Sequence, residues 1–161
     1  MAKEIVIIGA GGHALSCLDV INSSGIYFCI GYVDVRPSTD PRWKSLAYLG
    51  GDDAYAKILK TTPYFCLAVG QIESASAREK IAVLAKTAGG VFPAIVASTA
   101  YVSPTAELGE GTVVMQGAHV GPHAQVGRFN ILNTKSLLEH GVKTGEFTHV
   151  STAAVVNGDV V

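Results

Sequence analysis

Positive charge is not concentrated anywhere in this sequence of 161 residues. The chain carries 12 Lys and Arg against 13 Asp and Glu, which gives a formal net charge of −1 at pH 7. Proteins that bind nucleic acids need a concentrated basic surface, because contacts to the phosphates supply most of their affinity. The composition therefore argues against a nucleic acid as the main partner.

Long apolar segments and a leader peptide are also lacking. No stretch approaches the roughly 20 apolar residues of a membrane-spanning helix, and no charged N-terminal segment precedes a long apolar run, as in a signal peptide. Cysteine is scarce: Cys17, Cys29 and Cys66 lie in apolar segments, and no CxxC pair occurs. We expect three buried free thiols and a cytoplasmic protein.

The first 93 residues alternate between short apolar runs and segments with apolar residues at helical spacing. In the last of the helical segments, Ile81, Leu84 and Ala85 are expected to face the core. This alternation predicts a parallel sheet with helices on both faces, a small α/β unit of Rossmann-like type over residues 1–93. The expected strands are 4–8, 30–34 and 65–69, the expected helices are 12–24, 52–59 and 74–87, and 37–44 is expected to be a loop.

From Ala100 onward the sequence follows a period of six residues. The first position of each hexad is almost always small, and the third is aliphatic in nine of ten hexads. A parallel β-helix with three sides fits this period, with one short strand per side and coils about 4.8 Å apart. We expect a left-handed β-helix over residues 94–161. The third positions are Val102, Leu108, Val114, Val120, Val126, Leu132, Leu138, Thr144, Val150 and Val156.

The sequence stops inside a hexad, at Val161. A β-helix needs a cap over its open end and its unpaired strand edges. We expect either that the natural chain continues or that another chain covers this end.

A glycine-rich turn, GAGGHA at residues 9–14, follows the first expected strand and opens the first expected helix. It fits the pattern G-x-G-x-x-A, and Asp34 lies about where an acidic residue binds the ribose of NAD. The α/β unit is too small for a full dinucleotide fold, however. The same turn suits the phosphates of another nucleotide, because its backbone can approach them closely at a helix N-terminus.

The run NTKSLLEHGVKTGEFTHVS at 133–151, together with the GAGGHA turn, resembles the sialic acid O-acetyltransferase family. This family includes N-acetyltransferases that act on UDP-4-amino-4,6-dideoxy sugars and on GDP-perosamine. The resemblance covers essentially the whole chain. It implies a left-handed β-helix of hexapeptide repeats, acetyl-CoA as co-substrate, a homotrimer with active sites between subunits, and no metal.

The resemblance also implies catalytic roles. His140 matches the catalytic histidine, which would remove a proton from the attacking amine or hydroxyl; alternatively it is a solvated histidine at a coil corner. In close relatives an acidic residue often follows this histidine, but here it is Gly141. Because neighbouring extended residues point to opposite faces, Glu139 is not expected to hydrogen-bond His140 within its own chain. Glu139 or a carboxylate of another subunit is the expected substitute. Asn133 matches an asparagine near the acceptor, although an ordinary turn residue is an open alternative.

The expected binding residues fall into two groups. His149 and Gly158 match residues that contact acetyl-CoA, Gly158 through its backbone N–H. His13 is expected to touch the acceptor or else only to begin the helix, and Arg36 favours an anionic ligand. A metal site at His119 and His123 is not expected, since no carboxylate or cysteine accompanies them. The full set implied for the acceptor is Gly11, Gly12, His13, Asp34, Val35, Arg36 and Gly70.

These observations predict an acetyl-CoA-dependent acetyltransferase that acts on an amino group of a nucleotide-activated sugar, in the biosynthesis of surface glycans. Three other functions stay open. The acceptor group could be a hydroxyl of a sialic-acid-like sugar, the chain could bind a nucleotide sugar without turnover, or it could be an NAD-binding oxidoreductase.

Overall fold

The computed structural model describes residues 2–161. Contacts divide the chain into two compact units, Met1–Pro93 and Ala94–Val161. The first unit holds all the α-helices, and the second is built from pairs of extended residues joined by tight turns.

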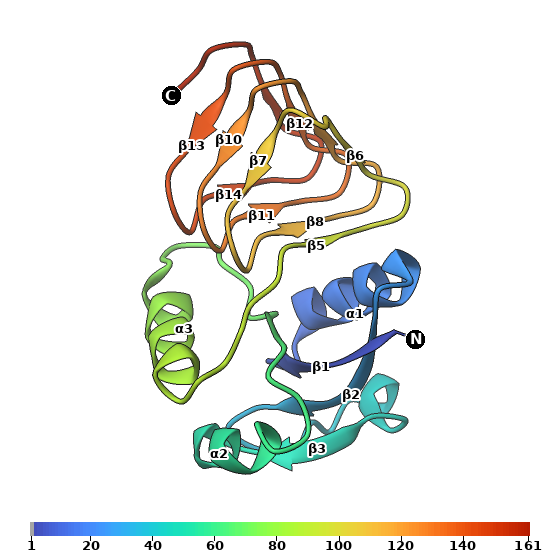
Figure 1. Ribbon diagram of the computed structural model, residues 1–161. Coiled ribbons are helices and arrows are strands. Elements are labelled where there is room, and N and C mark those ends of the chain that lie inside the picture. The colour runs from blue at the N-terminus through green and yellow to red at the C-terminus, as the bar shows by residue number, and fades with distance from the viewer. Residues whose placement is uncertain (1) are drawn as a thin grey trace. The chain divides into compact units, whose positions relative to one another are not determined.

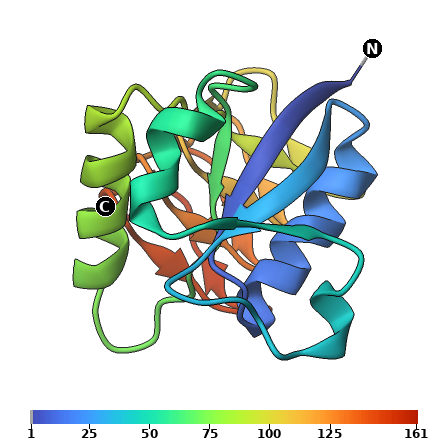
Figure 2. The same cartoon turned by 90° about the horizontal axis from the view of Figure 1, so that it is seen from below.

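The first unit contains a parallel four-stranded sheet in the order β3-β2-β1-β4. Figure 2 shows helix α1 on one side of this sheet and helices α2 and α3 on the other. The Rossmann-like arrangement is therefore confirmed, with four strands in place of six. The elements are β1 (Lys3–Ile8), α1 (Gly12–Ser24), β2 (Tyr27–Val33), β3 (Ala47–Gly50), α2 (Tyr55–Ile58), β4 (Phe65–Leu67) and α3 (Ser76–Thr87).

Several local expectations for this unit need correction. The edge strand β3 was not expected, because it has only four residues and is not continuously apolar. The expected loop 37–44 contains a 3-10 turn, Pro41–Trp43, whose Trp43 is buried against Tyr32. The expected helix 52–59 is a 3-10 turn, Asp52–Ala54, followed by the short helix α2. The conformation of these segments depends more on the packing of aromatic side chains from different segments than on helical periodicity.

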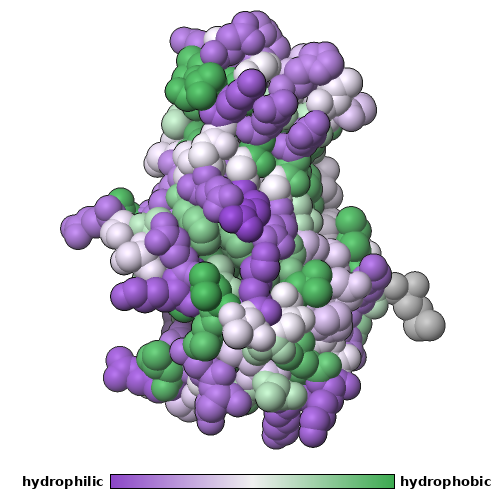
Figure 3. All heavy atoms as spheres, turned by 60° about the vertical axis from the view of Figure 1, so that its left-hand side comes forward, coloured by the Kyte–Doolittle hydropathy of each residue, from purple (hydrophilic) through white to green (hydrophobic). Residues whose placement is uncertain are grey.

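The buried face of α3 also differs from the expected one. Arg78, Ala82 and Ala85 are buried, whereas Leu84 is 44% exposed. The two small alanines let the helix lie close to the sheet, and the long Arg78 side chain occupies the space beside them. In Figure 3, exposed apolar residues of the face in view form separate spots between hydrophilic side chains.

The second unit is the predicted β-helix, and its fold is confirmed. Its strands are two residues long and parallel, and they stack into three sheets that form the sides of the helix, as Figure 1 shows. It begins one hexad before Ala100, at β5. The strands are β5 (Ile95–Val96), β6 (Tyr101–Val102), β7 (Glu107–Leu108), β8 (Val113–Val114), β9 (His119–Val120), β10 (Gln125–Val126), β11 (Ile131–Leu132), β12 (Leu137–Leu138), β13 (Lys143–Thr144), β14 (His149–Val150) and β15 (Val155–Val156).

The turns of the β-helix repeat one backbone conformation. The sixth residue of successive hexads has a positive φ, whether it is a glycine such as Gly141 (φ 67°) or another residue such as Asp159 (φ 58°). Left-handed backbone is costly for most side chains, so the coil geometry must impose it. A non-glycine residue at this position is therefore compatible with the fold.

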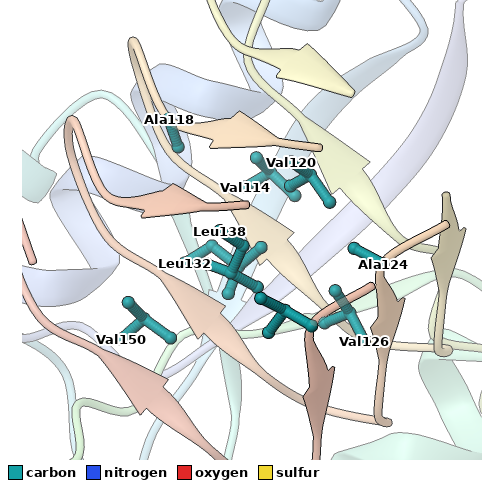
Figure 4. Close-up of a cluster of buried hydrophobic side chains, with 9 residues drawn as sticks. Val114, Ala118, Val120, Ala124, Val126, Leu132, Leu138 and Val150 are labelled. Atoms are coloured by element: carbon teal, nitrogen blue, oxygen red, sulfur yellow. The ribbon is translucent and has the colours of Figure 1, made fainter. Parts of the chain in front are cut away.

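The interior of the β-helix is filled by the first and third residues of the hexads. Figure 4 shows members of this core, including Leu132 and Leu138, pointing toward one another between the three sheets. Thr144 is the polar exception among the third positions. Its hydroxyl accepts a bond of 2.5 Å from the amide of buried Asn130 and another of 3.2 Å from the N–H of Gly127. A partly buried hydroxyl is thus satisfied without water.

The cysteines are free, as expected. Cys17 and Cys66 are buried, but Cys29 is only partly so, which corrects the expectation of three buried thiols. Burial raises the pKa of Cys29 to about 11, so its thiol stays protonated near neutral pH. No helix among residues 2–161 is long and apolar enough to cross a membrane.

Candidate active site

The glycine-rich turn is held by Asp34 at the end of β2. One carboxylate oxygen accepts the N–H of Ala10 at 2.9 Å and the other accepts the N–H of Val35 at 2.7 Å. Gly9 has φ 105°, and a Cβ on it would lie 3.1 Å from Cγ2 of Val69. Asp34 thus holds the glycine-rich turn in place. The sequence had indicated this residue only as a ligand for the ribose of a nucleotide.

Open space lies in front of the same turn. A Cβ on Gly11 or Gly12 would meet no atom within 4 Å. Since packing does not require glycine there, these two positions leave the backbone accessible to a ligand. Gly12 is also the first residue of α1, whose N-terminus favours negative charge.

A cavity of about 540 Å³ adjoins this turn. Its volume is in the range of small-ligand pockets. Four of the expected acceptor residues line it, namely Gly11, Asp34, Val35 and Arg36, together with Ala10 and residues 37–39. Gly12, His13 and Gly70 do not line it. Arg36 is exposed and makes no ion pair among residues 2–161, so its charge is available to an anionic ligand.

His13 and Gly70 lie side by side, since a Cβ on Gly70 would be 3.5 Å from Cβ of His13. Burial, and then the positive charge of Arg78, lower the pKa of His13 to about 4. His13 is therefore neutral at pH 7, and its Nε2 lies 3.5 Å from Sγ of Cys17. It can offer a hydrogen bond to a ligand but no charge.

Arg78 is the charged group in this region that the sequence did not single out. Its side chain is buried, and its Nη1 donates a bond of 3.1 Å to Oε1 of Gln71. Burial lowers its pKa to about 10, which leaves it protonated at pH 7. A lone arginine inside an amphipathic helical pattern reads as a solvated residue, so no sequence signal could have placed it in the interior.

In the β-helix, His140 lies in the turn between β12 and β13, and Gly158 lies one coil further along the chain. A Cβ on Gly158 would be 2.5 Å from Nε2 and 2.6 Å from Cε1 of His140. The imidazole thus lies directly against this glycine. The N–H of Gly158 makes no hydrogen bond among the described residues. An imidazole, which can act as a general base, and a free backbone N–H, which can stabilise an oxyanion, are therefore neighbours.

The carboxylate nearest to His140 is not the expected one. Glu139 makes no side-chain hydrogen bond or ion pair within residues 2–161, as the alternation of extended residues led us to expect. Asp159, which the sequence analysis did not consider, places Oδ2 3.7 Å from Nδ1 of His140. Asp159 lies 19 residues from His140 in the sequence, so no local pattern indicated this contact. The coil of three hexads brings residues about 18 positions apart next to one another.

Asn133 and His149 form a second pair. Nδ2 of Asn133 lies 3.0 Å from Nε2 of His149, and Oδ1 accepts the N–H of Thr134 at 2.8 Å. In this orientation the amide donates to Nε2, so the proton of the neutral His149 ring is on Nδ1. Asn133 is thus a turn residue and a partner of His149 at once.

His149 lies on strand β14, whereas Asn133, His140 and Gly158 lie in turns of the β-helix. Asn133 belongs to the turn between β11 and β12, and His140 to the turn after β12. Among residues 2–161, no group of three His, Cys, Asp or Glu side chains is placed to hold a metal ion. His119 instead stacks on Tyr101, with 4.8 Å between the ring centroids.

The chain thus combines a small parallel α/β unit that has an open glycine-rich turn with a β-helix that has an exposed histidine beside a free N–H, the architecture expected from the resemblance to hexapeptide-repeat acyltransferases. The comparisons agree. Residues 4–83 match the family model of the PglD N-terminal domain. The N-terminal unit is therefore similar to the PglD N-terminal domain, and the whole chain shares its fold with the solved acetyltransferases described next.

Three solved structures show the extent of the similarity. The acetyltransferase domain of PglB from Neisseria gonorrhoeae, in complex with acetyl coenzyme A, is 23% identical with a TM-score of 0.79, over 99% of this chain and 84% of that one. PerB from Caulobacter crescentus, in complex with CoA and GDP-perosamine, is 24% identical with a TM-score of 0.77, over 98% and 90%. WeeI from Acinetobacter baumannii is 15% identical with a TM-score of 0.71, over 97% and 81%.

Proposed function

We propose that this chain transfers an acetyl group from acetyl-CoA to an amino group of a nucleotide-activated sugar. The observation that carries the proposal is the contact of His140 with Gly158. It supplies a base and an oxyanion donor on a fold shared with proteins solved with acetyl coenzyme A and with GDP-perosamine. Surface glycan biosynthesis is the expected setting.

The chemistry needs one base and one donor. The amine nitrogen attacks the carbonyl carbon of the thioester, so that a C–N bond forms and the oxygen gains negative charge. The N–H of Gly158 stabilises that oxygen. Nε2 of His140 accepts the proton of the amine and returns it to the sulfur as the C–S bond breaks, which yields the amide and free CoA thiol. Holding amine and thioester together supplies much of the rate.

We assign acceptor binding to the first unit. The diphosphate would accept bonds from the backbone at Gly11 and Gly12, and Arg36 would add positive charge. Val35 and Asp34 would meet the nucleoside in the 540 Å³ cavity. His13 and Gly70 would contact the far end of the ligand. His149, kept in one tautomer by Asn133, would contact the thioester end of acetyl-CoA.

The test is an assay that follows the release of the free CoA thiol. The chain is mixed with acetyl-CoA and a UDP-4-amino-4,6-dideoxy sugar, and GDP-perosamine is assayed in parallel. We expect release with at least one amino sugar and a loss of about 10²- to 10⁴-fold in His140→Ala. His123→Ala, a change at an exposed histidine of another turn, should retain activity.

Each other outcome identifies a different function. Release only with a hydroxyl acceptor of sialic-acid type would indicate an O-acetyltransferase. Binding of the nucleotide sugar without release would indicate a binding protein, and affinity for NAD alone would indicate an oxidoreductase. Any of these three results contradicts the proposal.

We further propose that the chain is a cytoplasmic homotrimer with active sites between subunits. The support is the exposed position of His140, whose side chain is 60% exposed and which needs additional walls to exclude water from a reaction site. Sedimentation equilibrium should give three times the protomer mass of 16.7 kDa. A stable monomer would contradict this part of the proposal.

A further inference from the structure

Asp159 and His140 are joined across one coil of the β-helix. The N–H of Asp159 donates to the carbonyl oxygen of His140 at 2.9 Å, which fixes the two backbones relative to each other. With the backbones fixed in this way, Oδ2 of Asp159 lies 3.7 Å from Nδ1 of His140. A small rotation of either side chain brings this pair within hydrogen-bond distance.

The residues around this pair leave room for both groups. A Cβ on Gly141 would collide with Oδ1 of Asp159, so any side chain at 141 would compete with that carboxylate for the same space. A Cβ on Gly158 would collide with the imidazole. The imidazole ring therefore has Gly158 against it and the carboxylate of Asp159 close to its Nδ1. The two glycines permit this arrangement.

We propose that Asp159 is a positioning residue for His140. Its carboxylate accepts the Nδ1–H of the imidazole and so holds the tautomer in which Nε2 is the free base. Nε2 is also the ring nitrogen closest to the place where a Cβ of Gly158 would lie. The proposal rests on the proposed acetyl transfer for its kinetic consequences but not for the geometry of the pair.

The effect of this contact is on orientation rather than on stability. Both side chains are exposed, 60% for His140 and 80% for Asp159, and exposed ion pairs change stability little. Where a carboxylate orients a catalytic histidine, its loss leaves the base in the wrong tautomer for much of the time. Asp159 thus replaces the acidic residue that position 141 lacks.

The kinetic test uses Asp159→Asn, which keeps the size of the side chain and removes its charge. We expect kcat to fall about 10- to 100-fold, as for other residues that orient a functional histidine, while KM for acetyl-CoA changes less than about threefold. Glu107→Gln, an exposed carboxylate on β7, is the matched control and should retain kcat. Unchanged kcat in Asp159→Asn, or a large loss only in Glu139→Gln, would overturn the proposal.

A rescue separates positioning from a merely structural role. The double variant Gly141→Asp with Asp159→Gly moves the carboxylate to the competing position, where left-handed backbone already carries other side chains. We expect kcat to recover to within about fivefold of the wild type. If Asp159 only stabilised its own turn, the double variant would stay as slow as Asp159→Asn.

A measurement without turnover distinguishes this proposal from the proposed function. In protein labelled with ¹⁵N-histidine, the two ring nitrogens of His140 report the tautomer directly. We expect Nδ1–H to dominate in the wild type and in the double variant, and a mixture of both tautomers in Asp159→Asn. If the wild type transfers no acetyl group but shows this pattern, only the proposed function fails. If the tautomer is the same in all three proteins, the positioning role fails.

Discussion

The imidazole of His140 lies on Gly158, and this contact leaves no room for even a methyl group between them. A Cβ on Gly158 would approach three ring atoms to 2.5, 2.6 and 3.1 Å. The base and the backbone donor therefore depend on one another: the ring can occupy its place only while residue 158 has no side chain. The first prediction follows from this dependence.

Gly158→Ala should inactivate the protein without unfolding it. The new methyl group displaces the imidazole into solvent, to which the ring is already 60% exposed, and we expect a loss of about 10²-fold or more in kcat. The midpoint temperature of thermal unfolding should change by no more than about 2 °C. The control is Gly145→Ala, whose Cβ would be 3.8 Å from Oγ1 of Thr148. Full activity in Gly158→Ala would show that this ring position is not the reactive one.

Two arginines of one loop should differ in their effect on ligand binding. Arg36 lines the 540 Å³ cavity without an ion pair among the described residues, whereas Arg42 is paired with Asp40 at 2.6 Å. A charge-assisted bond to a phosphate contributes about 1.5–3 kcal/mol. We therefore expect Arg36→Ala to weaken nucleotide-sugar binding at least about tenfold by calorimetry. Arg42→Ala should bind normally, and equal losses in both would place the ligand elsewhere.

The stability of the first unit should depend on pH through His13. Its pKa is lowered from 6.5 to about 4 by burial and by Arg78. Between these two values the unfolded chain binds the proton more readily than the folded chain does. Stability is thus complete above pH 6.5 and falls as the pH drops toward 4, by about 3 kcal/mol at most.

The measurement compares urea unfolding at pH 7.5 and pH 5. His13→Gln, which cannot be protonated, should lose less stability over this interval than the wild type, while His123→Gln, at an exposed histidine, should lose as much as the wild type. The same loss in wild type and His13→Gln would contradict the burial of a neutral His13.

The inward register of the hexads predicts unequal effects at two adjacent leucines. Leu138 is fully buried in the core of the β-helix, whereas Leu137 on the same strand is only partly buried. We expect Leu138→Ala to lower the free energy of unfolding by about 2–5 kcal/mol. Leu137→Ala should cost less than about 1.5 kcal/mol. Equal costs in urea unfolding would mean that the strand does not point its third hexad residue inward.

Periodicity gave the strongest prediction from the sequence. A period of six with a small first and an aliphatic third residue has one structural solution, because each side of the β-helix must bury one side chain per strand. Leu132 and Val150 are accordingly in the core. In the first unit, periodicity did not predict the shortest elements. The strand β3 and the turn at Trp43 are held by aromatic packing between segments, which no local pattern records.

The candidate site divides in the same way. The sequence by itself determined the β-helix and the glycine-rich turn, and its resemblance to a known family selected His140, Gly158, Asn133 and His149 as residues of interest. Only the tertiary structure decided that Asp159 and not Glu139 faces the imidazole, and that Arg78 is buried near His13. The reason is physical: side-chain type and period are local properties, whereas the partner of a charge depends on which residues the coil or the sheet brings together.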